Sequence, residues 1–207
     1  MILPVTTTVT LMKSRQRHSW WFVIVLILLS LISISYLQDD SWEQEMMEWT
    51  GFLLTAVCVL GRTYCSVFIG GIKNQVVVRG GPFSIVRNPL YVFSFLGMCG
   101  IGLQSGRFSL LLLLVGGFIL YYKKVVAREE GFLEQKFGVE YVKYKTEVPR
   151  WFPKWSMWYE PEEISVRPYF VRHTMMDALT FFLPWPCFEL LQLTQQYGYL
   201  PHFITLV

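Results

Sequence analysis

Apolar positions gather in long uninterrupted runs along this chain, not in the short alternating patterns of a globular domain. The first run, 20–37, has no charged residue and follows Lys13, Arg15 and Arg17. Its length is close to the roughly 20 residues that a helix needs to cross a bilayer, so it predicts an uncleaved first span. Three further runs predict spans over 49–72, 90–103 and 108–122.

The third and fourth predicted spans are short and are joined by a tight turn at 104–107. They either extend through Val86 and Ala127 or form a tilted hairpin that does not cross the whole bilayer. Glycines in these runs would let helix backbones approach closely; they are Gly97, Gly100, Gly102, Gly116 and Gly117.

Beyond residue 123 the composition becomes charged and aromatic. Apolar side chains at steps of three and four predict an amphipathic helix along the membrane surface, bent at Gly138. They are Leu133, Phe137, Tyr141, Tyr144 and Val148. The last apolar stretch, 175–193, contains Asp177 and two prolines, so we expect an interfacial or re-entrant segment there and leave its topology open.

Composition agrees with a membrane protein, because 53% of the residues are hydrophobic and only 16% are charged. We therefore expect a single all-α integral membrane domain with four to five transmembrane helices. Its parts are 1–72 with the first two spans, 73–153 as a cofactor-binding core and 154–207 as a C-terminal interfacial region. The net charge of +3 without a basic stripe argues against nucleic acid. The spacing of His and Cys residues indicates no metal site.

Basic residues are distributed on one side of the predicted spans. The connection 38–48 is acidic, whereas Lys73, Arg79 and Arg87 follow the second span and Lys123 and Lys124 follow the fourth. Because Lys and Arg accumulate on the cytoplasmic side, the amino terminus, the loop 73–89 and everything after 123 should face the cytoplasm.

Two segments on that side carry candidate chemistry. The first segment is Gly80–Tyr91, in which Pro89 suits the first position of a helix. Arg87, Asn88 and Tyr91 lie near that helix start, where free backbone N–H groups favour an anion. Alternatively, Arg87 only anchors the chain and Asn88 only caps the helix.

The second segment contains Glu129 and Glu130, which could hold a cation such as an ammonium group. Neighbours on a helix point about 100° apart, so we expect at most one of them to face a given ligand. Alone, the pair could be a solvated charged turn. Together, the two segments have the charge pattern that an amino-acid zwitterion requires.

These residues resemble the isoprenylcysteine carboxyl methyltransferase and phospholipid methyltransferase superfamily over roughly residues 60–153. Gly80–Phe83 and Arg87–Tyr91 look like its glycine-proline-aromatic and Arg-His-Pro-x-Tyr blocks. Glu129-Glu130 to Val148-Pro149-Arg150 looks like its C-terminal block. Two positions depart from the pattern: Asn88 replaces the family histidine, and Phe93 replaces a glycine.

The resemblance implies S-adenosylmethionine as cofactor, bound without a Rossmann domain. Arg87, Asn88, Pro89 and Tyr91 would form the cofactor's carboxylate corner. Glu129 or Glu130 would hold its ammonium group, and Tyr141, Tyr144 and Arg150 would close the pocket. The expected catalytic residues are Glu129, Glu130 and Arg150.

Arg62 lies in the middle of the second predicted span, where a charge is costly and usually faces a cavity or a partner. It either contacts an anionic substrate headgroup or pairs within the helix bundle.

The function expected from these features is methyl transfer from S-adenosylmethionine to a lipid-like acceptor, a carboxylate or an amine, in a bacterial inner membrane. Two alternatives remain open: an NADPH-dependent membrane reductase of the sterol reductase type and a non-enzymatic membrane scaffold.

Overall fold

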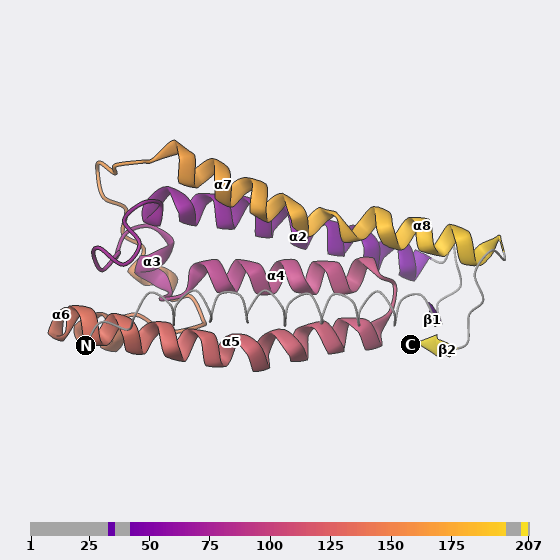
Figure 1. Cartoon of the computed structure of the whole chain (residues 1–207), viewed down its shortest axis with the longest axis horizontal. Coiled ribbons are helices and arrows are strands. Elements are labelled where there is room, and N and C mark those ends of the chain that lie inside the picture. Colours follow the sequence, from indigo (N-terminus) through magenta and orange to yellow (C-terminus); the bar gives the residue numbers. More distant parts are fainter. Residues whose placement is uncertain (1–32, 36–41, 198–203, 207) are drawn as a thin grey trace, which may run out of the picture.

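Five helices run along the length of the molecule in the computed structural model, which describes residues 33–35, 42–197 and 204–206 (Figure 1). They are α2 (Trp42–Ile69), α4 (Pro89–Gln104), α5 (Phe108–Phe137), α7 (Pro168–Leu179) and α8 (Pro184–Gln196). Two short helices, α3 (Pro82–Ile85) and α6 (Val139–Glu147), lie at one end, called here the α3–α6 end. Two 3₁₀ turns complete the helical elements: η1 (Trp155–Met157) and η2 (Thr180–Phe182).

The long helices are stacked in the order α5, α4, α2, α7, and each packs against the next. Small residues allow the closest approach, between α2 and α4. A methyl group added at Gly100 would lie 2.7 Å from the Gly51 carbonyl oxygen and 2.5 Å from Thr55 Oγ1. Close packing was predicted for five glycines, but at Gly116 no described atom lies within 4 Å of an added methyl group. Among the described helices, Gly116 therefore contributes no close approach.

Helix ends follow local chemistry at two positions near the site. Pro89 begins α4 at the position where its missing N–H costs no hydrogen bond. Gly138, with a φ of 54°, separates α5 from α6, and this confirms the predicted bend. Beyond Tyr122, α5 continues for four more turns, because its charged and polar residues are good helix formers.

Two described helices, α2 and α5, are long and apolar enough to cross a bilayer. At about 1.5 Å per residue, both exceed the ~30 Å of a hydrocarbon core, whereas the 16 residues of α4 fall short of it. The predicted span at 20–37 lies outside the described residues except for Ser33–Ser35. Those three form β1, which pairs in parallel with β2 (Ile204–Leu206); apart from this short ladder the described elements are all helical, as predicted. Backbone hydrogen bonds to a strand distant in sequence replace helical ones here.

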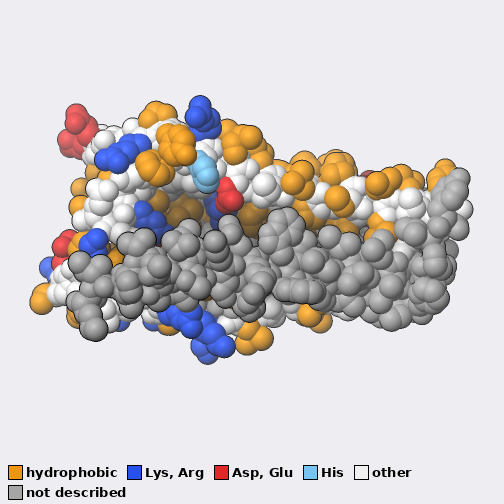
Figure 2. Space-filling model, in the orientation of Figure 1, with side chains coloured by type: hydrophobic (Ala, Val, Ile, Leu, Met, Phe, Trp, Pro, Cys, Tyr) orange, Lys and Arg blue, Asp and Glu red, His pale blue; other side chains and the backbone are white. Residues whose placement is uncertain are grey.

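From 168 to 196 the chain stays helical, since Thr180 and Leu183 both have right-handed helical dihedrals. α7 packs against α2, and α8 continues in the same direction along the bundle. Where described residues are visible in Figure 2, charged side chains gather toward the α3–α6 end, and orange and white surface dominates elsewhere.

Candidate functional site

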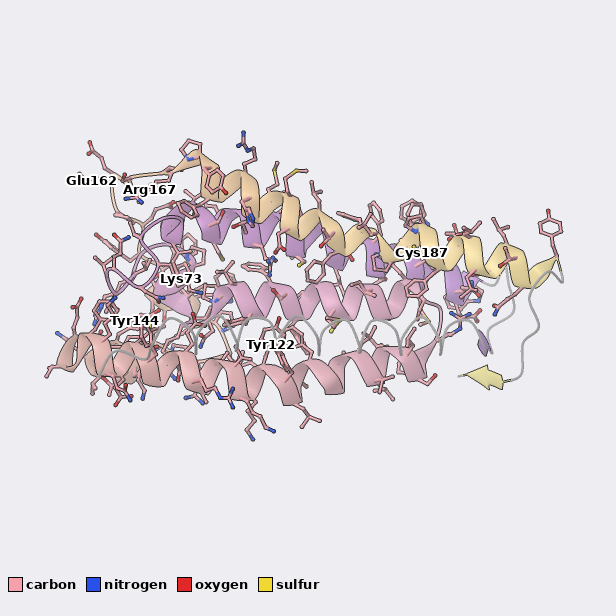
Figure 3. All side chains as sticks on the ribbon, in the orientation of Figure 1. Lys73, Tyr122, Tyr144, Glu162, Arg167 and Cys187 are labelled. Atoms are coloured by element: carbon pink, nitrogen blue, oxygen red, sulfur yellow. The ribbon has the colours of Figure 1, made fainter. Side chains whose placement is uncertain are left out.

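A cavity of ≈ 560 Å³ opens at the α3–α6 end of the bundle. Its wall comes from the end of α2, the loop 70–78, the start of α4, the middle of α5 and one face of α6. The volume lies within the range of small-molecule sites. Lys73 and Tyr144 lie at this end, and Tyr122 lies further along α5 (Figure 3); all three line the cavity.

Glu130 lies buried beside the cavity, with its side chain 3% exposed. Arg150 binds both of its oxygens, with Nη2 2.5 Å from Oε2 and Nε 3.2 Å from Oε1. Asn88 Nδ2 donates to Oε1 at 3.2 Å, and Arg87 Nε lies 3.5 Å from the same oxygen. Two guanidinium groups around one carboxylate leave this corner net positive.

Glu129 lines the cavity. Its neighbour Glu130 is not part of the cavity wall. Tyr91 donates its hydroxyl to Glu129 Oε2 at 2.7 Å, and Lys73 Nζ lies 2.8 Å from Oε1. The two adjacent carboxylates therefore have different environments: one is enclosed by guanidinium groups, and the other lies at the cavity surface beside an ammonium group.

The two sequence blocks are held together by hydrogen bonds to backbone carbonyl oxygens. Arg87 N donates to Pro149 O at 2.9 Å, and Arg87 Nη1 donates to Lys145 O at 3.1 Å. The Tyr144 hydroxyl donates to Phe83 O at 2.7 Å. These bonds fix the start of α4 against α6 although the two are more than 50 residues apart, and they prearrange the cavity.

Asn88 occupies the N-cap position of α4, but its side chain makes no capping hydrogen bond. Its amide is directed to Glu130 and to the Arg150 carbonyl oxygen, at 3.2 and 3.4 Å. The interpretation of Asn88 as merely a helix cap is therefore wrong: its side chain joins the two blocks.

Tyr141 and Tyr144 form a buried aromatic wall on α6, each 3% exposed. Burial raises the pKa of the Tyr141 phenol to about 12, and the negative charge of Glu130 acts in the same direction. Burial also raises the pKa of Tyr144. Both phenols are neutral donors at physiological pH. Arg150, expected with them as a closing residue, lies outside the cavity lining, and its side chain pairs with Glu130.

Arg62 lines the other end of the same cavity. Its guanidinium donates to Ser94 Oγ on α4 and to Asp177 Oδ2 on α7, and it lies 5.6 Å from the ring centre of Phe181. The pairing within the bundle that was one of the two alternatives is thus present. Asp177 was interpreted only as an obstacle to a spanning helix, but it is the partner of Arg62.

Lys73 was also missed as a site residue, because a lysine after an apolar run was assigned to the topological charge bias alone. Phe93, one of the two departures from the family pattern, packs over Gly61: an added methyl group at Gly61 would lie within 2.4 Å of the ring. Glycine at 61 thus leaves room for the ring that replaces the family's glycine.

Comparison with known proteins matches residues 49–140 to the phospholipid methyltransferase family. The nickel-cobalt-cadmium resistance protein NccN of Alcaligenes xylosoxydans xylosoxydans is 28% identical over 194 residues, covering 93% of this chain and 91% of that protein. The cobalt-zinc-cadmium resistance protein CzcN of Cupriavidus metallidurans is 28% identical over 169 residues, covering 81% and 78%.

The protein-S-isoprenylcysteine O-methyltransferase of Schizosaccharomyces pombe is 30% identical over 81 residues, which cover 39% of this chain and 34% of the enzyme. No solved structure matches the chain. The family match and the yeast enzyme confirm the predicted resemblance.

Proposed function

Because residues 49–140 carry the phospholipid methyltransferase pattern, we propose that the chain transfers a methyl group from S-adenosylmethionine to a membrane-associated, lipid-like acceptor. The observation that carries this proposal is the pairing of opposite charges at one cavity: Glu129 at its surface and the net-positive corner of Arg87, Arg150 and Glu130 beside it.

The donor set fits an amino-acid cofactor. Arg87 lines the cavity, and its buried Nε lies 3.5 Å from Glu130 Oε1 without a hydrogen bond to any described residue, so its guanidinium brings positive charge to the cavity wall. Glu129 supplies a carboxylate for an ammonium group. Phe83, Phe137, Tyr141 and Tyr144 supply aromatic walls for a flat heterocycle.

Within this proposal the residues that contact the cofactor differ from those that position them. Glu129 binds the cofactor's ammonium group, and Arg87, Asn88 and Tyr91 bind its carboxylate next to Pro89, while Tyr141 and Tyr144 exclude water. Glu130 and Arg150 position Asn88 and Arg87, because their side chains meet one another outside the cavity lining. They are therefore positioning groups, not the directly reacting groups expected from the sequence.

The bound cofactor supplies an activated methyl group on a sulfonium, which is already a good leaving group. The protein must then hold acceptor and donor aligned and dry, and this is the main source of rate acceleration for such a displacement. A carboxylate acceptor needs no base. An amine acceptor must lose a proton, and Glu129 is the carboxylate at the cavity surface that can accept it.

The charged α3–α6 end should face the cytoplasm, so that a water-soluble cofactor enters there and an apolar acceptor enters from the bilayer. The loop 70–81, which carries Lys73 and Arg79, supports this orientation. Two relatives that cover most of the chain come from bacteria, and this supports a bacterial inner membrane.

Melting of the detergent-solubilised protein tests the cofactor. S-adenosylhomocysteine should raise the melting temperature, and NADPH should not. Glu129→Gln should weaken S-adenosylhomocysteine binding about 10- to 100-fold, because a hydrogen bond to a charged group contributes about 1.5–3 kcal/mol. Glu162→Gln, in the exposed loop before α7, is the matched control. Stabilisation by NADPH alone would instead identify a reductase.

A non-enzymatic role in metal resistance is the second candidate, favoured by the names of the two relatives that cover most of the chain. Growth of expressing cells in cobalt, nickel or cadmium salts separates the two. Protection that survives Glu129→Gln indicates a scaffold, whereas protection lost with that variant indicates that resistance requires the cofactor site.

A further inference from the structure

The cavity contains a second charged group, the Arg62 guanidinium, about two turns before the end of α2. Its side chain is only 17% exposed. A charge in an apolar span is costly unless it is paired or faces a cavity. Arg62 meets both conditions, because it pairs with Asp177 and lines the cavity together with Ser94 and Thr174.

The pairing of Arg62 is incomplete. Its Nη atoms donate to Ser94 and Asp177, but its Nε is buried and has no hydrogen-bond partner among the residues that the structure describes. A guanidinium can hold a carboxylate or phosphate with two parallel bonds, and Arg62, which lines the cavity, still has this one buried donor to offer. Asp177, by contrast, is 57% exposed, so the ion pair is open on the side of α7.

Arg62 also lies at a suitable distance from the proposed cofactor site. Ser94, which accepts from Arg62, follows Tyr91, which donates to Glu129, by three residues on α4. Residues three apart lie on one helix face with an axial rise of about 4.5 Å. The Glu129 and Arg62 ends are thus about one helical turn apart along a shared cavity wall.

We propose that Arg62 binds the anionic headgroup of an amphiphilic acceptor, and that Asp177 is the internal anion that holds Arg62 before the acceptor enters. This inference rests on the proposed function and assigns its acceptor class: a lipid-like molecule with a carboxylate or phosphate group. The acceptor anion displaces Asp177 and gains the Nε donor.

Three single-chain amphiphiles serve as probes in non-ionic detergent: palmitate, hexadecyl phosphate and uncharged methyl palmitate. At least one anionic probe should raise the melting temperature of the wild-type protein, and methyl palmitate should not. The anion with the larger shift identifies the headgroup. Equal shifts with methyl palmitate, or no shift with either anion, would overturn the proposal.

Two variants test the roles of the pair, each compared with its own ligand-free melting temperature. Arg62→Gln should abolish the anion-dependent shift, whereas Arg172→Gln, an exposed arginine on the same helix as Asp177, should retain it. Asp177→Asn should strengthen anion binding about two- to tenfold, because the competing carboxylate is gone. Weaker binding in Asp177→Asn would show that the ion pair only stabilises the bundle.

S-adenosylhomocysteine binding separates this test from that of the proposed function. Both variants should retain the shift caused by S-adenosylhomocysteine, since neither residue contacts Glu129 or Glu130. Loss of that shift in the wild-type protein would refute the cofactor. An intact shift together with anion binding that is independent of Arg62 would refute only the acceptor site.

Discussion

At the scale of single residues, Lys73 has a consequence for the affinity of the proposed cofactor. Its ammonium group lies 2.8 Å from Glu129 Oε1, the place where a ligand ammonium would bind. The lysine is about half exposed, so the pair contributes at most about 1 kcal/mol. Lys73→Gln should therefore tighten S-adenosylhomocysteine binding about two- to fivefold in calorimetric titration.

Lys143→Gln provides the control for this substitution. Lys143 is also paired with a glutamate, Glu147, but on the exposed face of α6. It should leave the affinity unchanged. If Lys73→Gln weakened binding instead, Lys73 would be a ligand-binding group and not a competitor for Glu129.

Tyr141 provides a prediction for alkaline pH. Its pKa is raised from 10.0 to about 12 in the folded protein, so the folded state favours the neutral phenol more than the unfolded state does. The stabilisation is complete below pH 10 and is lost as the pH rises from 10 to 12, by about 1.4 kcal/mol per unit.

Chemical unfolding between pH 9 and pH 11 measures this loss. Tyr141→Phe should flatten the decline, because phenylalanine has no proton to lose. Tyr159→Phe, at an exposed site, should decline as the wild type does. Parallel curves for all three proteins would contradict a buried Tyr141 phenol.

The sequence identified most residues of the site, but it did not predict which side chains form ion pairs or hydrogen bonds with one another. The sequence identified Glu129 and Glu130 and predicted that adjacent helical residues diverge, but only the three-dimensional arrangement shows that Glu129 faces the cavity. Arg62 and Asp177 are 115 residues apart. A lone base and a lone acid in separate apolar segments are a signal for pairing, yet each had been interpreted by itself.

At the scale of helices, glycine packing between α2 and α4 is a strong determinant of stability. A methyl group at Gly100 would meet the α2 backbone, which cannot yield as a flexible side chain can. Overpacking of this kind costs about 1–3 kcal/mol. Gly100→Ala should lower the melting temperature of the detergent-solubilised protein by several degrees.

The matched substitution is Gly116→Ala on α5, where no described atom lies within 4 Å of the added methyl group. Alanine favours a helix over glycine by up to about 1 kcal/mol, so this variant should melt at the same or a slightly higher temperature. A large fall in both variants would indicate that helix packing does not explain the loss at Gly100.

Helix boundaries were predictable where local chemistry sets them and not where packing does. Pro89 and Gly138 mark an observed start and an observed bend, as their backbone preferences require. The apolar run that ends at Tyr122 underestimated the length of α5 by 15 residues. An apolar run marks only the part of a helix that suits a lipid environment, and α5 continues beyond it through charged residues to Phe137.

At the scale of the whole molecule, the C-terminal helices determine how the chain lies in a membrane. The sequence predicted an interfacial or re-entrant course, because two prolines and Asp177 interrupt the last apolar stretch. The structure places Pro184 at the first turn of α8, where proline is tolerated, and it neutralises Asp177 with Arg62. Neither Pro184 nor Asp177 therefore prevents this segment from running along the bundle, and α7 and α8 follow the bundle axis.

We therefore expect the chain to cross the bilayer between the loop before α7 and the end of α8. Single cysteines introduced by Glu162→Cys and Tyr197→Cys, in a background with Cys187→Ser, can test this in intact cells. Tyr197 is 73% exposed. A membrane-impermeant maleimide should label position 197 from outside and should reach position 162 only after the cells are opened, because the α3–α6 end faces the cytoplasm. Labelling of both positions only in opened cells would return α7 and α8 to the cytoplasmic surface, and labelling of both from outside would reverse the proposed orientation.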